Sequence, residues 1–109
     1  EQLAARGVDI YVTELDVDDS ALPADVEARD AIVARRYHEV LSAVLRASSV
    51  KVVQCWQLAD RYSWLRAPEV QHLSGAPFPA RPLPFDDGLR EKPAAEAIRR
   101  AFAARKRGW

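Results

Sequence analysis

Three carboxylate side chains stand close together near the start of the 109-residue sequence, at Glu14, Asp16 and Asp18. They follow the β-branched and aromatic run 10–13, which predicts a strand, and side chains alternate along a strand. The three acids would therefore share one face, together with Ile10 and Val12. Carboxyl groups at the carboxyl end of a buried parallel strand lie where α/β enzymes place their chemistry. These residues alone are equally compatible with a polar turn that ends the strand.

The elements that must position these acids follow from hydrophobic periodicity and turn residues. Residues 1–6 have the pattern of a helix end, and Gly7 is the expected stop. We then expect a strand at about 8–16, a helix at about 24–47, a strand at about 50–57, a long loop at about 57–91 and a helix at about 92–105. Six of the seven prolines lie in or beside the loop, and loops of that length are usually functional or disordered.

Both long helices have residues that recur at intervals of three and four and predict an apolar face. In the first helix these are Val33, Tyr37, Val40, Leu41, Val44 and Leu45, and in the last helix Ala97, Ile98, Ala101 and Phe102. The order βαβα predicts an α/β fold with parallel strands. Two parallel strands leave both edges of the sheet unpaired. Because the sequence also opens as a helix end, we expect a C-terminal piece of a longer polypeptide.

The composition narrows the class of protein. The apolar fraction is 49% and the formal net charge is zero, so the chain has no electrostatic footprint for nucleic acid or a membrane surface. A length of 109 residues suits one domain. The single cysteine, Cys55, cannot form an internal disulfide. Neither histidine lies at metal-ligand spacing from an acid or from Cys55, so we expect no metal and no cofactor.

Three segments in order resemble the endo-1,4-β-xylanases of glycoside hydrolase family 10. The run 12–17, Val-Thr-Glu-Leu-Asp-Val, is similar to the seventh strand of that family. Segment 52–65, with two tryptophans eight residues apart and an Asp-x-x-Ser-Trp ending, resembles the eighth strand and its loop. Segments 83–86 and 92–94 are similar to the closing loop and last helix. The likeness covers roughly residues 7–103.

The resemblance implies a (β/α)8 TIM barrel, of which this chain would supply the last two βα units, as the C-terminal part of one catalytic domain. It also implies hydrolysis of internal β-1,4-xylosidic bonds in xylan by a retaining double displacement. The expected partner is therefore xylan or a xylo-oligosaccharide, with no nucleic acid and no membrane. The remainder of the barrel would lie upstream. Secretion is implied by the polymeric substrate of the family.

Residue roles carry over where the motifs match. Glu14 matches the nucleophile of the family, and Asp16 matches an aspartate that orients a histidine beside that nucleophile. Trp56 and Trp64 match the aromatic walls of the sugar site, where a flat indole covers the apolar face of a xylose ring. Arg66 follows the second tryptophan and is a weaker candidate for substrate contact, since a solvated surface position is at least as compatible with the sequence.

Two departures from the family pattern stand out. The family commonly has Gly directly after the first tryptophan, whereas this chain has Gln57. Glycine permits close approach of the backbone to a ligand, so the geometry of the sugar site is affected. The acid/base glutamate of the family lies on its fourth strand, and no residue here matches that motif. We therefore expect the chain alone to be inactive.

Two other functions are compatible with the residues. The chain could be a non-catalytic carbohydrate-binding or assembly fragment, in which the two tryptophans stack on sugar without chemistry. It could also belong to a related β-1,4-glycanase barrel, such as a cellulase, with a glutamate at the same strand end. The spacing of the tryptophans argues against the second alternative, and the exposed edges of a partial barrel argue against the first.

Overall fold

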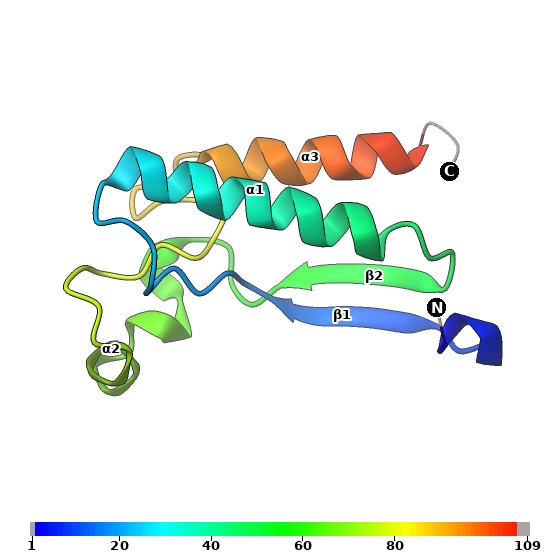
Figure 1. The fold of residues 1–109 in the computed structure, drawn as a ribbon, viewed down its shortest axis with the longest axis horizontal. Helices are drawn as coiled ribbons and strands as arrows, with labels where there is room; N and C mark the ends of the chain where they lie inside the picture. Colours follow the sequence, from blue (N-terminus) through cyan, green and yellow to red (C-terminus); the bar gives the residue numbers. More distant parts are fainter. Residues whose placement is uncertain (1, 107–109) are drawn as a thin grey trace.

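In the computed structural model, which describes residues 2–106, two long helices lie over one face of a two-stranded parallel sheet (Figure 1). The strands are β1 (Ile10–Leu15) and β2 (Val50–Cys55), and the helices are α1 (Val26–Val44), α2 (Pro68–Ser74) and α3 (Pro93–Lys106). Short 3-10 helices span Ala4–Arg6, Asp60–Tyr62 and Trp64–Arg66. The parallel pairing expected from the βαβα order is confirmed.

The ends of α1 have local causes. Asp25 is the N-cap, and its side chain accepts a hydrogen bond of 2.9 Å from the Ala28 amide, which satisfies one of the free donors of the first turn. The helix ends at Val44, with Leu45 as its C-cap, shortly before the Ser48-Ser49 pair. It therefore occupies the middle of the expected range 24–47. At the start of the chain, Gly7 has a φ of 72° and caps the first 3-10 helix, as its position after residues 1–6 predicted.

The strands do not keep a simple alternation of side chains. Val12 pairs with Val53 and Leu15 pairs with Cys55, so β1 carries one extra residue between these pairs. Such a shift moves later side chains to the opposite face. Leu15 accordingly packs in the helix-covered core, while Glu14 is exposed.

The expectation that Ile10 and Val12 share a face with Glu14 is therefore wrong. Ile10 packs against the cluster beneath the helices, and Val12 lies in the groove beside α1. The extra residue in β1 separates both of them from the acidic side chain. Simple alternation could not predict this, because it assumes an uninterrupted ladder of strand pairs.

The core lies between the sheet and the two long helices. Val33, Tyr37 and Leu41 of α1 are almost fully buried, as are Ala97 and Ala101 of α3. These residues confirm the predicted inward faces in part. Two members of the predicted set lie outward instead, since Val40 is 44% exposed and Phe102 is 36% exposed. The small residues of α3 let that helix approach α1 closely, which leaves the larger Phe102 at the margin.

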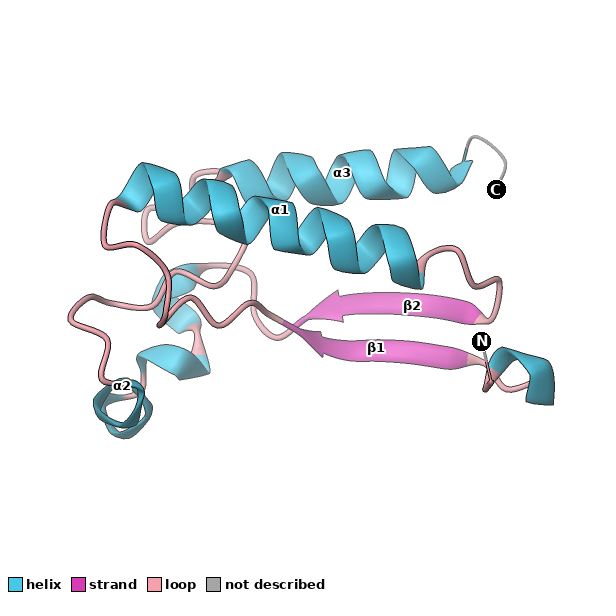
Figure 2. Ribbon diagram, viewed as in Figure 1, coloured by secondary structure: helices cyan, strands magenta, loops and turns pink. Residues whose placement is uncertain are grey.

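The segment 57–91 lies beyond the carboxyl ends of both strands (Figure 2). It was expected as a long loop, but it contains α2 as well as two of the 3-10 helices. Pro68 lies in the first turn of α2, and Gly75, with a φ of 67°, ends it. Both residues are ordinary signals for a helix start and stop. No helix in the described part of the chain has the length and apolarity needed to cross a bilayer.

Candidate active site

Four of the residues singled out in the sequence line one open cleft of about 370 Å³: Glu14, Asp16, Trp56 and Trp64. The two acids come from the end of β1, and Trp56 directly follows β2. The Trp56 amide donates a hydrogen bond of 3.2 Å to the Leu15 carbonyl, which continues the strand pairing to the edge of the cleft. The cleft therefore forms where two parallel strands end side by side.

Trp64 reaches the cleft from the following segment. It opens a 3-10 helix whose N-cap, Ser63, accepts a hydrogen bond from the Leu65 amide. Its indole Nε1 donates a hydrogen bond of 2.7 Å to Oδ2 of Asp16. Trp56 and Trp64 are 41% and 49% exposed, so neither is a core residue. Two half-exposed indoles beside a carboxylate are suited to stacking on a sugar ring.

Arg66 is not among the residues that line this cleft. Its Nε donates a hydrogen bond of 2.7 Å to the Ala80 carbonyl, and its Nη1 lies 2.7 Å from the Asp87 carboxylate. These bonds tie the 3-10 helix Trp64–Arg66 to the Pro-rich segment. Contact between Arg66 and substrate stays a prediction, and the observed partners describe a bracing role.

Gln57 retains a backbone conformation that glycine adopts most easily. Its φ is 82°, in the left-handed region where side chains of L-residues are strained. The side chain itself does not line the cleft. Gln57 therefore adopts the backbone conformation that the glycine usual at this position would adopt. The cost of having a side chain there is backbone strain directly after Trp56.

A buried network of three acids and three bases holds the segments around the cleft. Nε of Arg29 lies 3.2 Å from Oδ2 of Asp19, and the Arg81 backbone amide donates a hydrogen bond to the same oxygen. The Arg81 guanidinium donates two hydrogen bonds, of 2.9 and 2.6 Å, to Asp30 of α1. Because Asp19 follows the end of β1, this half of the network fixes the path of the chain after Asp16.

The other half of the network centres on Lys92. Its ammonium donates 2.9 Å hydrogen bonds to Asp60 and to the Arg81 carbonyl. Asp60 also accepts a hydrogen bond from the Leu83 amide. Burial raises the pKa of Asp60, although the neighbouring Lys92 and the Leu83 amide act in the opposite direction. Sequence patterns do not indicate these contacts, because most of them join residues that lie 23 to 62 positions apart.

Burial also affects the pKa of two groups in the core, Cys55 and Tyr37. It is the main cause that raises the pKa of the Cys55 thiol, and the Asp16 carboxylate adds to the effect. Cys55 is therefore a neutral thiol at pH 7. Burial likewise raises the pKa of Tyr37, with smaller effects from Cys55, Asp16 and Asp60. The Tyr37 hydroxyl donates a hydrogen bond of 2.6 Å to the Pro82 carbonyl. Within residues 2–106 no group of His, Cys, Asp and Glu could hold a metal ion.

The sequence matches the model of a known family, described as glycosyl hydrolase family 10, over residues 1–101. It is 32% identical to endo-1,4-beta-xylanase C of Phanerodontia chrysosporium over 93% of this chain and 23% of that protein. Identity to endo-1,4-beta-xylanase 5 of Pyricularia oryzae is 31%, over 95% of this chain and 24% of the relative. The chain thus spans about a quarter of the length of these relatives.

Solved structures give the same result for the fold. Native xylanase 10B from Thermotoga maritima superposes with a TM-score of 0.78 and 26% identity, over 97% of this chain and 30% of the xylanase. Xylanase 10B from Thermotoga petrophila RKU-1, solved in complex with xylobiose, superposes with a TM-score of 0.76 and 26% identity, over 94% and 29% of the two chains. The two βα units correspond to a part of these barrels.

Proposed function

The chain belongs to glycosyl hydrolase family 10, and on that premise we propose that its protein hydrolyses internal β-1,4-xylosidic bonds of xylan by a retaining double displacement. The observation that carries the proposal is the convergence of Glu14, Trp56 and Trp64 on one cleft at the strand ends. We place the chain as the last two βα units of the (β/α)8 barrel. Secretion is part of this proposal, because the substrate is a polymer.

In the proposed reaction Glu14 attacks the anomeric carbon of a xylose residue. The bond to the leaving oxygen breaks as a glycosyl-enzyme ester forms, and a second carboxyl group, about 5–5.5 Å away, protonates that oxygen. Water, deprotonated by the second carboxyl group, then attacks the anomeric carbon and releases Glu14. The second group would come from a strand outside this chain, so the 109 residues alone would show negligible hydrolysis.

The exposure of Glu14 suits this role. It is an exposed side chain that lines the cleft, where a ring stacked on Trp56 or Trp64 could present its anomeric carbon. Asp16 is half-buried and is held by the indole of Trp64. We assign Asp16 as a positioning residue, which matches the family aspartate that acts through a neighbour.

The decisive experiment is Glu14→Gln in the full-length polypeptide, with release of reducing sugar from xylan as the measurement. The expected result is a loss of kcat of about a thousandfold or more, because the amide cannot form the covalent intermediate. Glu39→Gln is the matched control, since Glu39 is an exposed residue of α1 with only a loose 3.9 Å pair to Arg35. Equal activity of the two variants would reject Glu14 as the nucleophile.

The same experiment separates the proposal from its alternatives. A carbohydrate-binding fragment would bind xylo-oligosaccharide with equal affinity in both variants, and the full-length polypeptide would release no sugar. A related glycanase would release sugar from β-1,4-glucan faster than from xylan.

For the retaining mechanism, the small anion azide should rescue Glu14→Gly and yield a glycosyl azide of inverted configuration, because it attacks from the side that Glu14 vacated.

A further inference from the structure

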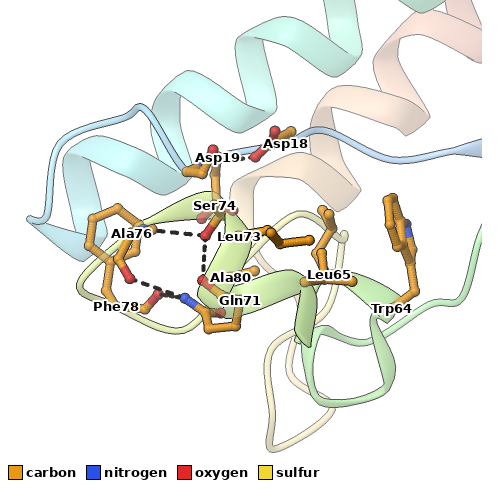
Figure 3. A pocket seen from close by; sticks show the side chains of 12 residues that line it. Asp18, Asp19, Trp64, Leu65, Gln71, Leu73, Ser74, Ala76, Phe78 and Ala80 are labelled. Atoms are coloured by element: carbon orange, nitrogen blue, oxygen red, sulfur yellow. Dashed lines mark hydrogen bonds between the residues drawn. The ribbon is translucent and has the colours of Figure 1, made fainter. Parts of the chain in front are cut away.

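A second hollow, of about 250 Å³, lies beside the cleft, between α2, the Pro-rich segment and the loop after β1. We call it the Trp64–Phe78 pocket. In Figure 3 Trp64 stands at one end and Phe78 at the other, with Leu65 and Leu73 between them. The lining residues that matter for a ligand are Asp18, Ser20, Trp64, Gln71, Phe78 and Ala80.

Trp64 lines both the cleft and this pocket. The edge of its indole is fixed by the 2.7 Å hydrogen bond to Asp16. The indole ring is therefore a fixed wall between the cleft and the pocket, and each of its two faces offers an apolar surface to a ligand. A molecule large enough to lie on both sides of Trp64 would occupy the cleft and the pocket together.

The far wall of the pocket is also held in place. Phe78 is covered by the Arg29 guanidinium, whose Cζ lies 3.9 Å from the centre of the ring. The Gln71 side-chain amide donates hydrogen bonds to the Ala76 and Phe78 carbonyls, of 3.3 and 2.7 Å. The pocket thus has built walls at both ends.

The polar groups that remain available in the pocket include the Asp18 carboxylate, which accepts, and the Ser20 hydroxyl, which can both donate and accept. The amide hydrogens of Gln71 are used by the two carbonyls, and the Ser74 hydroxyl already donates to the Gln71 carbonyl and accepts from the Ala76 amide. Asp18 accepts a hydrogen bond from the Ser20 amide through one oxygen, which leaves its other oxygen for a ligand. Among the described residues the lining contains no Lys, Arg or His.

This lining specifies the ligand chemistry. A purely apolar ligand would strip water from the Asp18 carboxylate and give no hydrogen bond in return, which costs free energy. An anionic ligand would meet that carboxylate with no lining cation to offset it. A neutral sugar ring satisfies both demands, because its hydroxyls donate to Asp18 and its apolar face covers the indole.

We propose that the Trp64–Phe78 pocket binds one neutral sugar substituent carried by the xylan main chain in the adjoining cleft. This inference rests on the proposed function and narrows its substrate class to xylan with neutral side groups. Trp64 is the shared wall that joins the main-chain site to the substituent site. The pocket, at about 250 Å³, is sized for a single ring rather than for a longer branch.

The test compares two ligands on the full-length polypeptide, inactivated by Glu14→Gln. One ligand is linear xylotriose, and the other is the same trisaccharide with a single neutral pentose substituent. Asp18→Ala removes the free acceptor, and Ala80→Leu fills the pocket. Each variant should weaken binding of the substituted ligand about tenfold in isothermal titration calorimetry, while linear xylotriose binds unchanged.

The matched control is Ala103→Leu, which adds the same side chain to an exposed position of α3. It should leave the affinity for both ligands unchanged. A trisaccharide with an acidic substituent should bind the parent more weakly than the neutral one, and Asp18→Asn should narrow that difference. Thermal unfolding of each variant checks that the fold is intact.

Two results would overturn the inference. If both pocket variants bind the substituted and linear ligands with equal losses, or with no loss, then the substituent does not enter the pocket. The latter result is expected if another part of the polypeptide covers it. If linear xylotriose does not bind even the Glu14→Gln protein with an unchanged pocket, the proposed function itself fails. Failure of the pocket inference alone would leave the binding of linear xylotriose intact.

Discussion

The indole Nε1 of Trp64 and the carboxylate of Asp16 are joined by a 2.7 Å hydrogen bond across 48 residues of sequence. The bond connects the end of β1 to the aromatic wall that reaches the cleft from the 57–91 segment. A charged acceptor makes it stronger than a neutral hydrogen bond. The orientation of the proposed sugar platform is thus set by the residue two positions after the proposed nucleophile.

Asp16→Ala should free the indole of Trp64 and weaken binding of linear xylotriose by roughly five- to tenfold, because one charge-assisted hydrogen bond is lost. Asp16→Asn keeps an acceptor oxygen and should lose less. The indole N–H resonance of Trp64 in a 15N NMR spectrum should move in both variants, while that of Trp56 stays in place. An unmoved Trp64 resonance would show that the hydrogen bond is absent in solution.

Gln57→Gly should stabilise the protein by about 0.5–1 kcal/mol. The strain of an L-residue at a φ of 82° exceeds the entropy that glycine loses on folding. Urea unfolding measures the change. Gln57→Ala is the control, because alanine has the same Cβ and should give no comparable gain. Equal stability of the Gly and Ala variants would mean that the turn is not strained.

Lys92→Met should destabilise the protein by about 3–5 kcal/mol, since Asp60 is fully buried and loses its cationic partner. Lys51→Met is the control. Lys51 is an exposed residue with a 3.9 Å pair to Asp9, and its loss should change stability by no more than about 0.5 kcal/mol. Similar losses in the two variants would contradict the importance of the buried pair.

The cost of Lys92→Met should also depend on pH. Because burial raises the pKa of Asp60, the folded state binds more protons than the unfolded state between the ordinary value of 3.8 and the raised value. Stability from this group is present below that window and is lost as pH rises through it. Without Lys92 the carboxylate loses a group that favours its charge, so the variant should be destabilised less at acidic than at neutral pH.

Tyr37→Phe should cost about 1–2 kcal/mol, because the Pro82 carbonyl would lose its 2.6 Å donor and keep the longer, 3.4 Å hydrogen bond from the Val17 amide. Tyr62→Phe removes a hydroxyl from a side chain that is 56% exposed, and water can replace its contact with Arg61. That control should be close to neutral in the same urea titration. A neutral Tyr37→Phe would indicate that water reaches Pro82.

Sequence reasoning located the elements because local chemistry determines them. The Asp25 cap, the Gly7 stop and the three- and four-residue intervals of α1 all act within a few positions. The helix α2 could have been found in the same way, from Pro68 and Gly75. The prolines around it dominate the pattern and favour a loop instead.

The features that escaped prediction depend on contacts between distant segments. The face of the sheet on which Glu14 lies depends on an extra residue in the pairing of β1 with β2. The alternation of side chains along one strand carries no information about that pairing. The pairing of Arg81 with Asp30 joins residues 51 positions apart. The positive φ of Gln57 had only an indirect signal, the glycine that the family commonly has there. The strand pattern placed Glu14 and Asp16 at a strand end, whereas the expectation that the two tryptophans lie beside them came from the resemblance to the family.

The balance of charges in the buried network has a consequence for recombination. Asp19, Asp30 and Asp60 find their partners in Arg29, Arg81 and Lys92, all between the end of β1 and the start of α3. A crossover between two related sequences just before β1 would therefore transfer every member of the network together. Neither parent's buried charges would then be separated from their partners. Chimaeras joined at that point should fold more often than chimaeras joined within 30–81, where Asp30 would be parted from Arg81.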